Sequence, residues 1–89
     1  MSETTYQRAA GALDAIVDGE VVLLSPADMS YHSLDRVGAR VWAQVAQPAT
    51  IDEIVAALRS EYVVDEDRCR ADLQPFLDRM VAIGIFEAG

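Results

Sequence analysis

The sequence predicts an α+β domain in which a three-stranded antiparallel sheet is followed by three helices. Residues 13–33 are rich in β-branched side chains and are interrupted by turn-forming residues, a pattern typical of short strands. Residues 35–84 repeat apolar side chains at intervals of three or four, a pattern typical of amphipathic helices. A chain of 89 residues has room for one domain with one small core.

The composition is globular and strongly acidic. Apolar residues make up 52% of the sequence and charged residues 25%, and no apolar run approaches the ~20 residues of a membrane span. Seven arginines, no lysine and fifteen acidic residues give a net charge of −8, which repels a phosphate backbone and disfavours nucleic acid as a partner. Residues 1–10 lack the basic and apolar segments of a secretory signal, so we expect a cytoplasmic protein.

The chain offers few side chains for catalysis or metal binding. Cys69 is the single cysteine and His32 the single histidine, too few for an internal disulfide or a tetrahedral zinc site. A general base or a nucleophile needs a neighbour that orients it, and the sequence indicates none for either residue. We therefore expect no enzymatic activity, no metal and no cofactor.

The first ordered elements form a β-hairpin. Two β-branched runs, residues 13–17 and 21–24, flank Asp18-Gly19, a pair that tolerates the positive φ angles of a tight hairpin turn. Residues 1–11 carry no comparable pattern and predict a flexible N-terminal lead, which places the folded domain at residues 12–89.

A third strand is expected directly after this hairpin. Ser25-Pro26-Ala27-Asp28 supplies turn residues, and Pro26 cannot donate to a strand ladder. The extended stretch Met29-Ser30-Tyr31-His32-Ser33 follows this turn and predicts the strand.

Three helices follow the strands, each with its own start signal. The first begins at an Asp35 N-cap and ends before Pro48, and the second begins with the capping pair Thr50 and Glu53 and ends near Tyr62. The expected core-facing side chains of these two helices are Val37, Val41, Trp42, Val45, Ile51, Ile54, Val55 and Leu58. Within the first helix, Gly38 suggests a close approach of another chain segment.

The third helix begins at an Asp65 N-cap and ends at Gly84, which suits a left-handed C-cap. Ile85 and Phe86 are expected to fold back on its last turn. Its apolar stripe comprises Cys69, Leu73, Phe76, Leu77 and Met80. Pro75 cannot bond to the carbonyl of Ala71 and predicts a kink.

Three strands followed by three helices is the order of a winged helix-turn-helix with its sheet placed first. Two segments narrow this class further, residues 34–42 (LDRVGARVW) and residues 72–80 (DLQPFLDRM) with the Gly84-Ile85 that follows. Both segments resemble the PqqD family, and the resemblance extends over about residues 13–86. Pro75 and the lack of a glycine before Met29 depart from the family pattern, which leaves the local shape of a binding groove open.

The resemblance implies a stand-alone recognition element for ribosomally made, post-translationally modified peptides. Such an element binds the leader segment of a precursor peptide and delivers it to a separate modifying enzyme, for example a protease, a cyclase or a radical enzyme. Physically, an open strand edge can pair with an extended leader while pockets beside the last helix select its side chains. Matching positions give the strand role to Met29, Ser30, Tyr31, His32 and Ser33, and the pocket role to Arg68, Cys69, Asp72, Leu73 and Phe76.

Two other functions remain open on the sequence alone. A winged-helix DNA-binding regulator would insert its third helix into the major groove, but that helix carries more acids than arginines. A structural subunit of a larger enzyme would use the same strand edge as a leader-binding protein. The peptide class, which includes lasso peptides, and the choice between a monomer and an edge-strand dimer stay open too.

Overall fold

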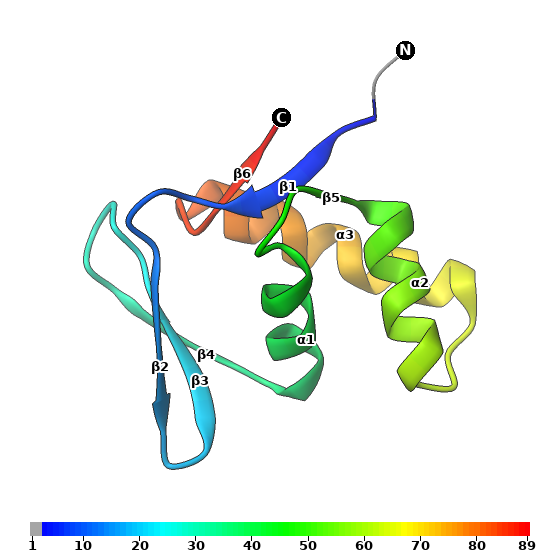
Figure 1. The fold of residues 1–89 in the computed structure, drawn as a ribbon, viewed down its shortest axis with the longest axis horizontal. Coiled ribbons are helices and arrows are strands. Elements are labelled where there is room, and N and C mark those ends of the chain that lie inside the picture. Colours follow the sequence, from blue (N-terminus) through cyan, green and yellow to red (C-terminus); the bar gives the residue numbers. More distant parts are fainter. Residues whose placement is uncertain (1–2) are drawn as a thin grey trace.

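The computed structural model describes residues 3–89, which form six strands and three helices (Figure 1). In chain order the elements are β1 (Thr5–Arg8), β2 (Leu13–Val17), β3 (Glu20–Leu24), β4 (Tyr31–Leu34), α1 (Arg36–Gln44), β5 (Ala49–Thr50), α2 (Ile51–Glu61), α3 (Glu66–Ala82) and β6 (Phe86–Ala88). The strands form two antiparallel sheets, β2–β3–β4 and β5–β1–β6. The predicted α+β class is confirmed, and the sheet β5–β1–β6 is an addition to it.

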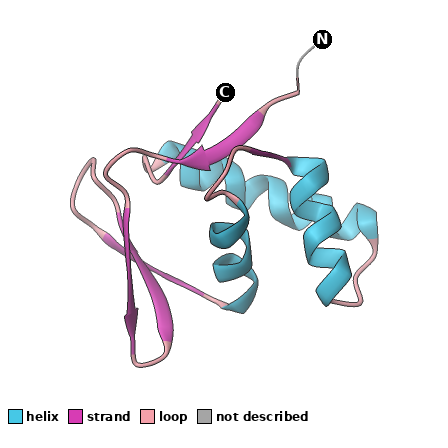
Figure 2. Cartoon of the chain, in the orientation of Figure 1, coloured by secondary structure: helices cyan, strands magenta, loops and turns pink. Residues whose placement is uncertain are grey.

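The hairpin of β2 and β3 forms as the sequence predicts. Its register pairs Val17 with Glu20 across the turn, and Asp18 and Gly19 adopt φ angles of 52° and 81°. Positive φ at both turn positions matches the right-handed twist of the flanking strands. Figure 2 shows this hairpin projecting away from the group of helices.

The third predicted strand begins two residues later than expected. β4 covers Tyr31–Leu34, whereas Met29 has a φ angle of 61° and lies in the preceding turn. Asp28 Oδ1 accepts hydrogen bonds from both the N–H and the hydroxyl of Ser30. These bonds hold Met29 and Ser30 in a local turn, so the prediction that they belong to the strand was wrong.

The helix boundaries follow from their caps. Asp35 accepts a hydrogen bond from Gly38 N–H at α1, and Asp65 accepts one from Arg68 N–H at α3. Thr50 and Glu53 form the complete capping box at α2. The three predicted starts are therefore confirmed, and α3 continues through Pro75 to Ala82 as one helix.

The N-terminal lead predicted for residues 1–11 contains a strand. β1 pairs with β5 on one side and β6 on the other, and Tyr6 is buried in the core. The Arg8 guanidinium lies 3.9 Å from the centre of the Trp42 ring and donates to the Trp42 carbonyl oxygen at 2.8 Å. These contacts are made with segments that are distant in the sequence. The four residues of β1 carry no local pattern from which the contacts could be predicted.

The core lies between the three helices and the inner faces of the two sheets. Its fully buried side chains are Leu23, Val41, Val45, Ile54, Leu77, Met80, Ile85 and Phe86. Phe86 stacks on Trp42 with ring centres 6.2 Å apart, so the segment after α3 folds back as predicted. Val37, expected in the core stripe of α1, is instead 43% exposed. Across the described residues no helix is long and apolar enough to cross a membrane.

Candidate functional site

A groove of about 430 Å³ lies where β4, α1, the end of α2 and α3 meet. Its lining residues are Ser33, Leu34, Asp35, Val37, Gly38, Val41, Leu58, Tyr62, Val64, Cys69, Asp72, Leu73, Phe76 and Arg79. Most of these side chains are apolar, and the charged groups belong to Asp35, Asp72 and Arg79. The groove therefore suits an apolar side chain accompanied by a few polar contacts.

The strand beside this groove is an edge strand with an open side. β4 pairs with β3 alone, and Ser25 N–H donates to Ser30 O just before it. Because hydrogen-bonded and non-hydrogen-bonded pairs alternate in an antiparallel ladder, we expect Tyr31 and Ser33 to direct their main-chain N–H and C=O groups outward. Outside the β3–β4 ladder, no main-chain group of residues 3–89 bonds to the backbone of Tyr31 or Ser33.

One close contact sets the junction between this strand and α1. A methyl group at Gly38 would lie 3.3 Å from Leu34 Cδ2 and 3.2 Å from Asp35 Oδ1. Glycine therefore lets the first turn of α1 approach the end of β4. The close neighbours of Gly38 are thus side chains of Leu34 and Asp35, whereas the glycine had suggested a close approach of backbone.

The opposite wall of the groove is one face of α3. Four of the predicted pocket residues line it together: Cys69, Asp72, Leu73 and Phe76. Arg79 lies one turn beyond Phe76 and lines the same wall, but the sequence analysis did not select it. The helical spacing from Asp72 through Phe76 to Arg79 was the signal that could have found it.

The remaining predicted site residues lie at the margins of the groove. Ser33 lines it, whereas Tyr31 is 76% exposed beside the open strand edge. His32 lies on the same strand, and its Nε2 is 2.8 Å from Ser30 Oγ. Arg68 is exposed and pairs with Asp72 at 3.5 Å, one turn along α3. Met29 belongs to the turn before the strand and does not line the groove.

Several groove residues were not predicted as site residues. They come from α1, from the end of α2 and from the loop before α3: Val37, Val41, Leu58, Tyr62 and Val64. None of them carried a usable sequence signal: Val37, Val41 and Leu58 have the helical spacing of ordinary core residues, and Tyr62 and Val64 lie between α2 and α3. Their position at the groove depends on how the helices pack.

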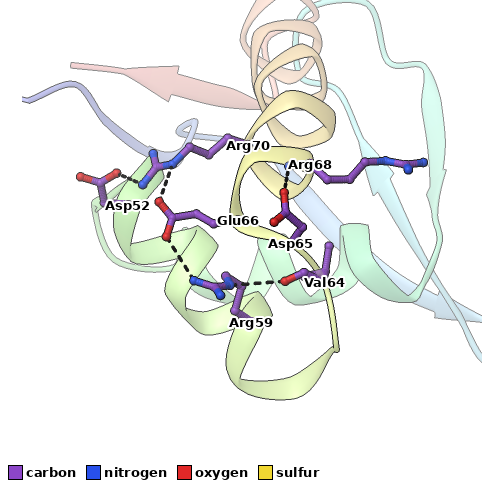
Figure 3. Close-up of polar contacts among 7 residues, drawn as sticks. All are labelled: Asp52, Arg59, Val64, Asp65, Glu66, Arg68 and Arg70. Carbon is purple, nitrogen blue, oxygen red and sulfur yellow. Dashed lines mark hydrogen bonds and ion pairs between the residues drawn. The ribbon is translucent and has the colours of Figure 1, made fainter.

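Ion pairs between α2 and α3 support this wall from the far side (Figure 3). Arg70 pairs with Asp52 and Glu66, and Glu66 also pairs with Arg59 at 3.1 Å. The hydrogen bond with Asp52 is the main cause that raises the pKa of Arg70, so its charge is retained. Figure 3 shows Arg68 extending away from this cluster, which leaves Arg68 on the side of α3 that carries Asp72.

Cys69 has the properties of a groove wall and not of a nucleophile. Its side chain is buried, and burial raises the pKa of the thiol above the ordinary value of 9.0. The thiolate is the reactive form of cysteine, so burial disfavours reaction of this thiol. The site as a whole offers an open strand edge, an apolar groove and a few charges, which are the features of a peptide-binding surface.

Comparisons with known proteins agree with this geometry. Residues 20–85 match the family described as coenzyme PQQ synthesis protein D (PqqD). A solved structure described as TbiB1 in complex with the TbiA(beta) leader peptide has the same fold, with a TM-score of 0.81 and 33% sequence identity over 91% of this chain and 94% of that one. A search of curated proteins gave no match. The match over three quarters of the residues, together with the shared fold, shows that this chain belongs to the PqqD family.

Proposed function

We propose that this protein is a recognition element that binds the leader segment of a ribosomally made precursor peptide and delivers it to a modifying enzyme. The leader adds as a strand to the open edge of β4 and places alternate side chains into the groove against α3. The protein contributes binding and positioning, and the enzyme contributes the chemistry. We expect this delivery in the cytoplasm, where ribosomes make the precursor.

One observation carries this proposal: an unpaired strand edge runs beside an apolar groove. The outward main-chain groups of Tyr31 and Ser33 would bond to the leader whatever its sequence, while the groove would select its side chains. The structural relative TbiB1, which is similar over most of both chains, is described in complex with a leader peptide. The shared fold and the family membership support the same kind of ligand here.

The charges of the groove suggest which leader residues are preferred. Arg79 lines the groove and forms no ion pair with any residue in 3–89. A leader carboxylate placed there would form a charge-assisted pair. Asp72 is exposed and is paired with Arg68, so its contribution to leader binding is shared between the two side chains.

The DNA-binding alternative finds no support in the geometry. Three of the four arginines on α2 and α3 (Arg59, Arg68 and Arg70) are paired with acids, and the fourth, Arg79, which forms no ion pair within residues 3–89, lines the groove. Asp67, Asp72 and Asp78 also lie along α3, so this helix presents a mixed and mainly acidic surface to any duplex. A helix that enters the major groove needs free cations at its phosphate contacts.

The direct test is fluorescence anisotropy with a labelled leader peptide from the precursor encoded beside this protein. We expect a dissociation constant of about micromolar or tighter for the purified chain. A generic duplex of the same label and concentration, at low salt, serves as the comparison and should show no binding. Failure to bind the leader, with the protein folded, would overturn the proposal.

Two substitutions at one position separate strand pairing from side-chain contacts. Tyr31→Pro removes an outward N–H, and Tyr31→Val removes the same side chain but keeps that N–H. We expect the proline variant to bind the leader about tenfold more weakly than the valine variant, the loss of one main-chain hydrogen bond. Both variants should melt as cooperatively as the wild type. Equal affinities for the leader would mean that it does not pair with this edge.

A further inference from the structure

The sheet β2–β3–β4 has a second, outer face that is largely exposed to solvent, since all of β2 is exposed and Tyr31 on β4 is 76% exposed. The register aligns Leu13, Leu24 and Tyr31 in one cross-strand row, and Ala15, Val22 and Ser33 in the next. Directly opposed residues on antiparallel strands point to the same face. The inner face carries Leu23 and Leu34, which are buried, so these two rows face away from the helices.

This outer sheet face is defined by Leu13, Ala15, Val17, Glu20, Val22, Leu24, Tyr31 and Ser33. It is mainly apolar, with Glu20 at its hairpin end and Ser33 on β4 as the polar members. Leu13 is 60% exposed and Val17 is 52% exposed. Residues of an antiparallel sheet that face water are usually polar. A contiguous apolar sheet face in an acidic protein therefore indicates a surface that another molecule covers.

The charges around the outer sheet face have one sign. Residues 12–34 contain neither arginine nor lysine, and their acids are Asp14, Asp18, Glu20 and Asp28. Asp14 points to the inner face and accepts a hydrogen bond from Trp42 Nε1, which leaves the other three around the outer sheet face. Asp18 and Glu20 lie at the hairpin tip, and Asp28 lies in the turn before β4. A partner that fits this face has an apolar centre with Lys or Arg at its rim.

A second copy of this chain does not meet that requirement. Each copy carries a net charge of −8, so two copies stacked through their outer sheet faces would repel one another. Like charges placed opposite one another across an interface oppose its formation. The charge pattern thus favours a different protein as the occupant.

The outer sheet face is also continuous with the proposed leader site. A leader strand that pairs with β4 extends the same sheet, and alternate side chains of that strand point to the same side as Tyr31. A protein bound over the outer sheet face would therefore contact the leader as well. This arrangement is suited to an enzyme that must act on a peptide held by this chain.

We infer that the outer sheet face is the docking surface for the modifying enzyme, through an apolar patch of the enzyme that is rimmed by Lys or Arg. This inference rests on the proposed function, because it takes the enzyme as the receiver of the leader. It adds where the enzyme binds and which surface chemistry recognises it. The leader groove and the enzyme surface then lie on one sheet, at its β4 edge and on its outer side.

The test uses the purified modifying enzyme of the same precursor as the probe. The double variant Leu13→Thr/Val17→Thr makes the outer sheet face polar, and threonine keeps the strand propensity. Ile16→Thr is the matched control, because Ile16 lies on the same strand and is 68% exposed but points to the opposite face. Circular dichroism and thermal melting establish that both variants fold.

We expect the double variant to bind the enzyme at least about tenfold more weakly, because the contact loses two apolar side chains. Ile16→Thr should bind within about twofold of the wild type, and all three proteins should bind the labelled leader equally. Asp18→Lys/Glu20→Lys, which leaves the apolar centre intact, should slow association and reduce its dependence on salt.

Each alternative outcome identifies what has failed. Unchanged enzyme affinity in the folded double variant would overturn the docking surface. Concentration-dependent dimers of the wild type that are absent from the double variant would also overturn it, because a second copy would then cover the outer sheet face. If the wild-type protein does not bind the leader, the proposed function is overturned. If the wild type binds the leader but not the enzyme, this inference alone is overturned.

Discussion

The two sheets of this protein are built by opposite means and serve different purposes. The sheet β5–β1–β6 joins three segments from the beginning, the middle and the end of the chain, and each contributes a buried residue: Ala49, Tyr6 and Phe86. The sheet β2–β3–β4 is made of consecutive segments, and all five residues of β2 are exposed. The first sheet closes the core, and the second presents an edge and an outer face to solvent (Figure 1).

This difference shows how a small domain can remain stable and still offer a large binding surface. Strands that pair across long sequence separations tie the chain ends to the core, as in the bonds between Thr5 and Gly89. The hairpin sheet can then leave its edge unpaired without loss of the fold. Stability should accordingly respond to changes in the first sheet, and binding should respond to changes around the second.

Deletion of residues 1–8 should have the largest effect, because it removes the strand that joins β5 to β6. The buried Tyr6 ring and the Arg8 contacts with Trp42 are lost together. We expect the free energy of unfolding to fall by roughly 4–6 kcal/mol, enough to unfold a marginal domain. Urea denaturation followed by circular dichroism measures the change. An unchanged urea midpoint would mean that these residues are a flexible N-terminal segment that does not contribute to stability.

Phe86→Ala should have the next largest effect. The Phe86 ring is fully buried and contacts the rings of Trp42 and Phe76, so its removal should cost about 3–5 kcal/mol. Ile16→Ala on the exposed strand β2 is the comparison and should cost less than about 0.5 kcal/mol. Thermal and urea melting of the two variants checks this difference. Similar losses would mean that the two sheets contribute equally to stability.

Val37→Asn should affect leader binding more than stability. Val37 lines the groove and is largely solvent-accessible in the free protein. Replacing it removes apolar surface that a leader side chain would cover, worth about 1–2 kcal/mol or roughly tenfold in affinity. Ala43→Asn on the same helix, exposed but away from the groove, is the control. Anisotropy with the labelled leader should distinguish the two variants, while their melting temperatures stay close.

Asp28→Asn should have the smallest effect and should depend on pH. The hydrogen bonds from Ser30 lower the pKa of the Asp28 carboxyl below its ordinary value of 3.8. A lowered folded-state pKa adds stability above pH 3.8, and this stability is lost as the pH falls through the folded-state pKa. The wild type should melt slightly above the variant at pH 6, and the difference should vanish once the pH falls below the folded-state pKa of Asp28. A difference that persists at low pH would assign the effect to packing of the turn.

Much of the fold could be predicted from short stretches of sequence because the signals are local. Asp18-Gly19 specifies the hairpin turn, and Asp35, Thr50 and Asp65 each satisfy free backbone N–H groups at a helix start. The order of strands and helices then predicts the winged helix-turn-helix class. The motifs at residues 34–42 and 72–80 led to the PqqD family, which the comparison confirms.

The candidate site could be predicted in part. Cys69, Asp72, Leu73 and Phe76 share one face of a helix, and helical periodicity was enough to group them. Met29 and Ser30 were predicted to belong to the strand because they follow the turn residues in an extended stretch. The prediction was wrong because the hydrogen bonds from Ser30 to Asp28 compete with strand pairing, and the outcome of that competition depends on exact backbone geometry. Arg79 and Val64 reach the groove through the packing of α3 against its neighbours.

The sequence by itself determined the hairpin, the three helices and their caps, and the acidic surface, since each depends on residues that are close together along the chain; its motifs also indicated the family. The tertiary structure decided that β1 completes a second sheet, that Val37 lies at a groove and that the β4 edge of the hairpin sheet runs beside that groove. These features depend on contacts between segments tens of residues apart, and such contacts leave no periodic pattern in either partner. For that reason the binding surfaces, more than the fold, became visible once the chain was seen in three dimensions.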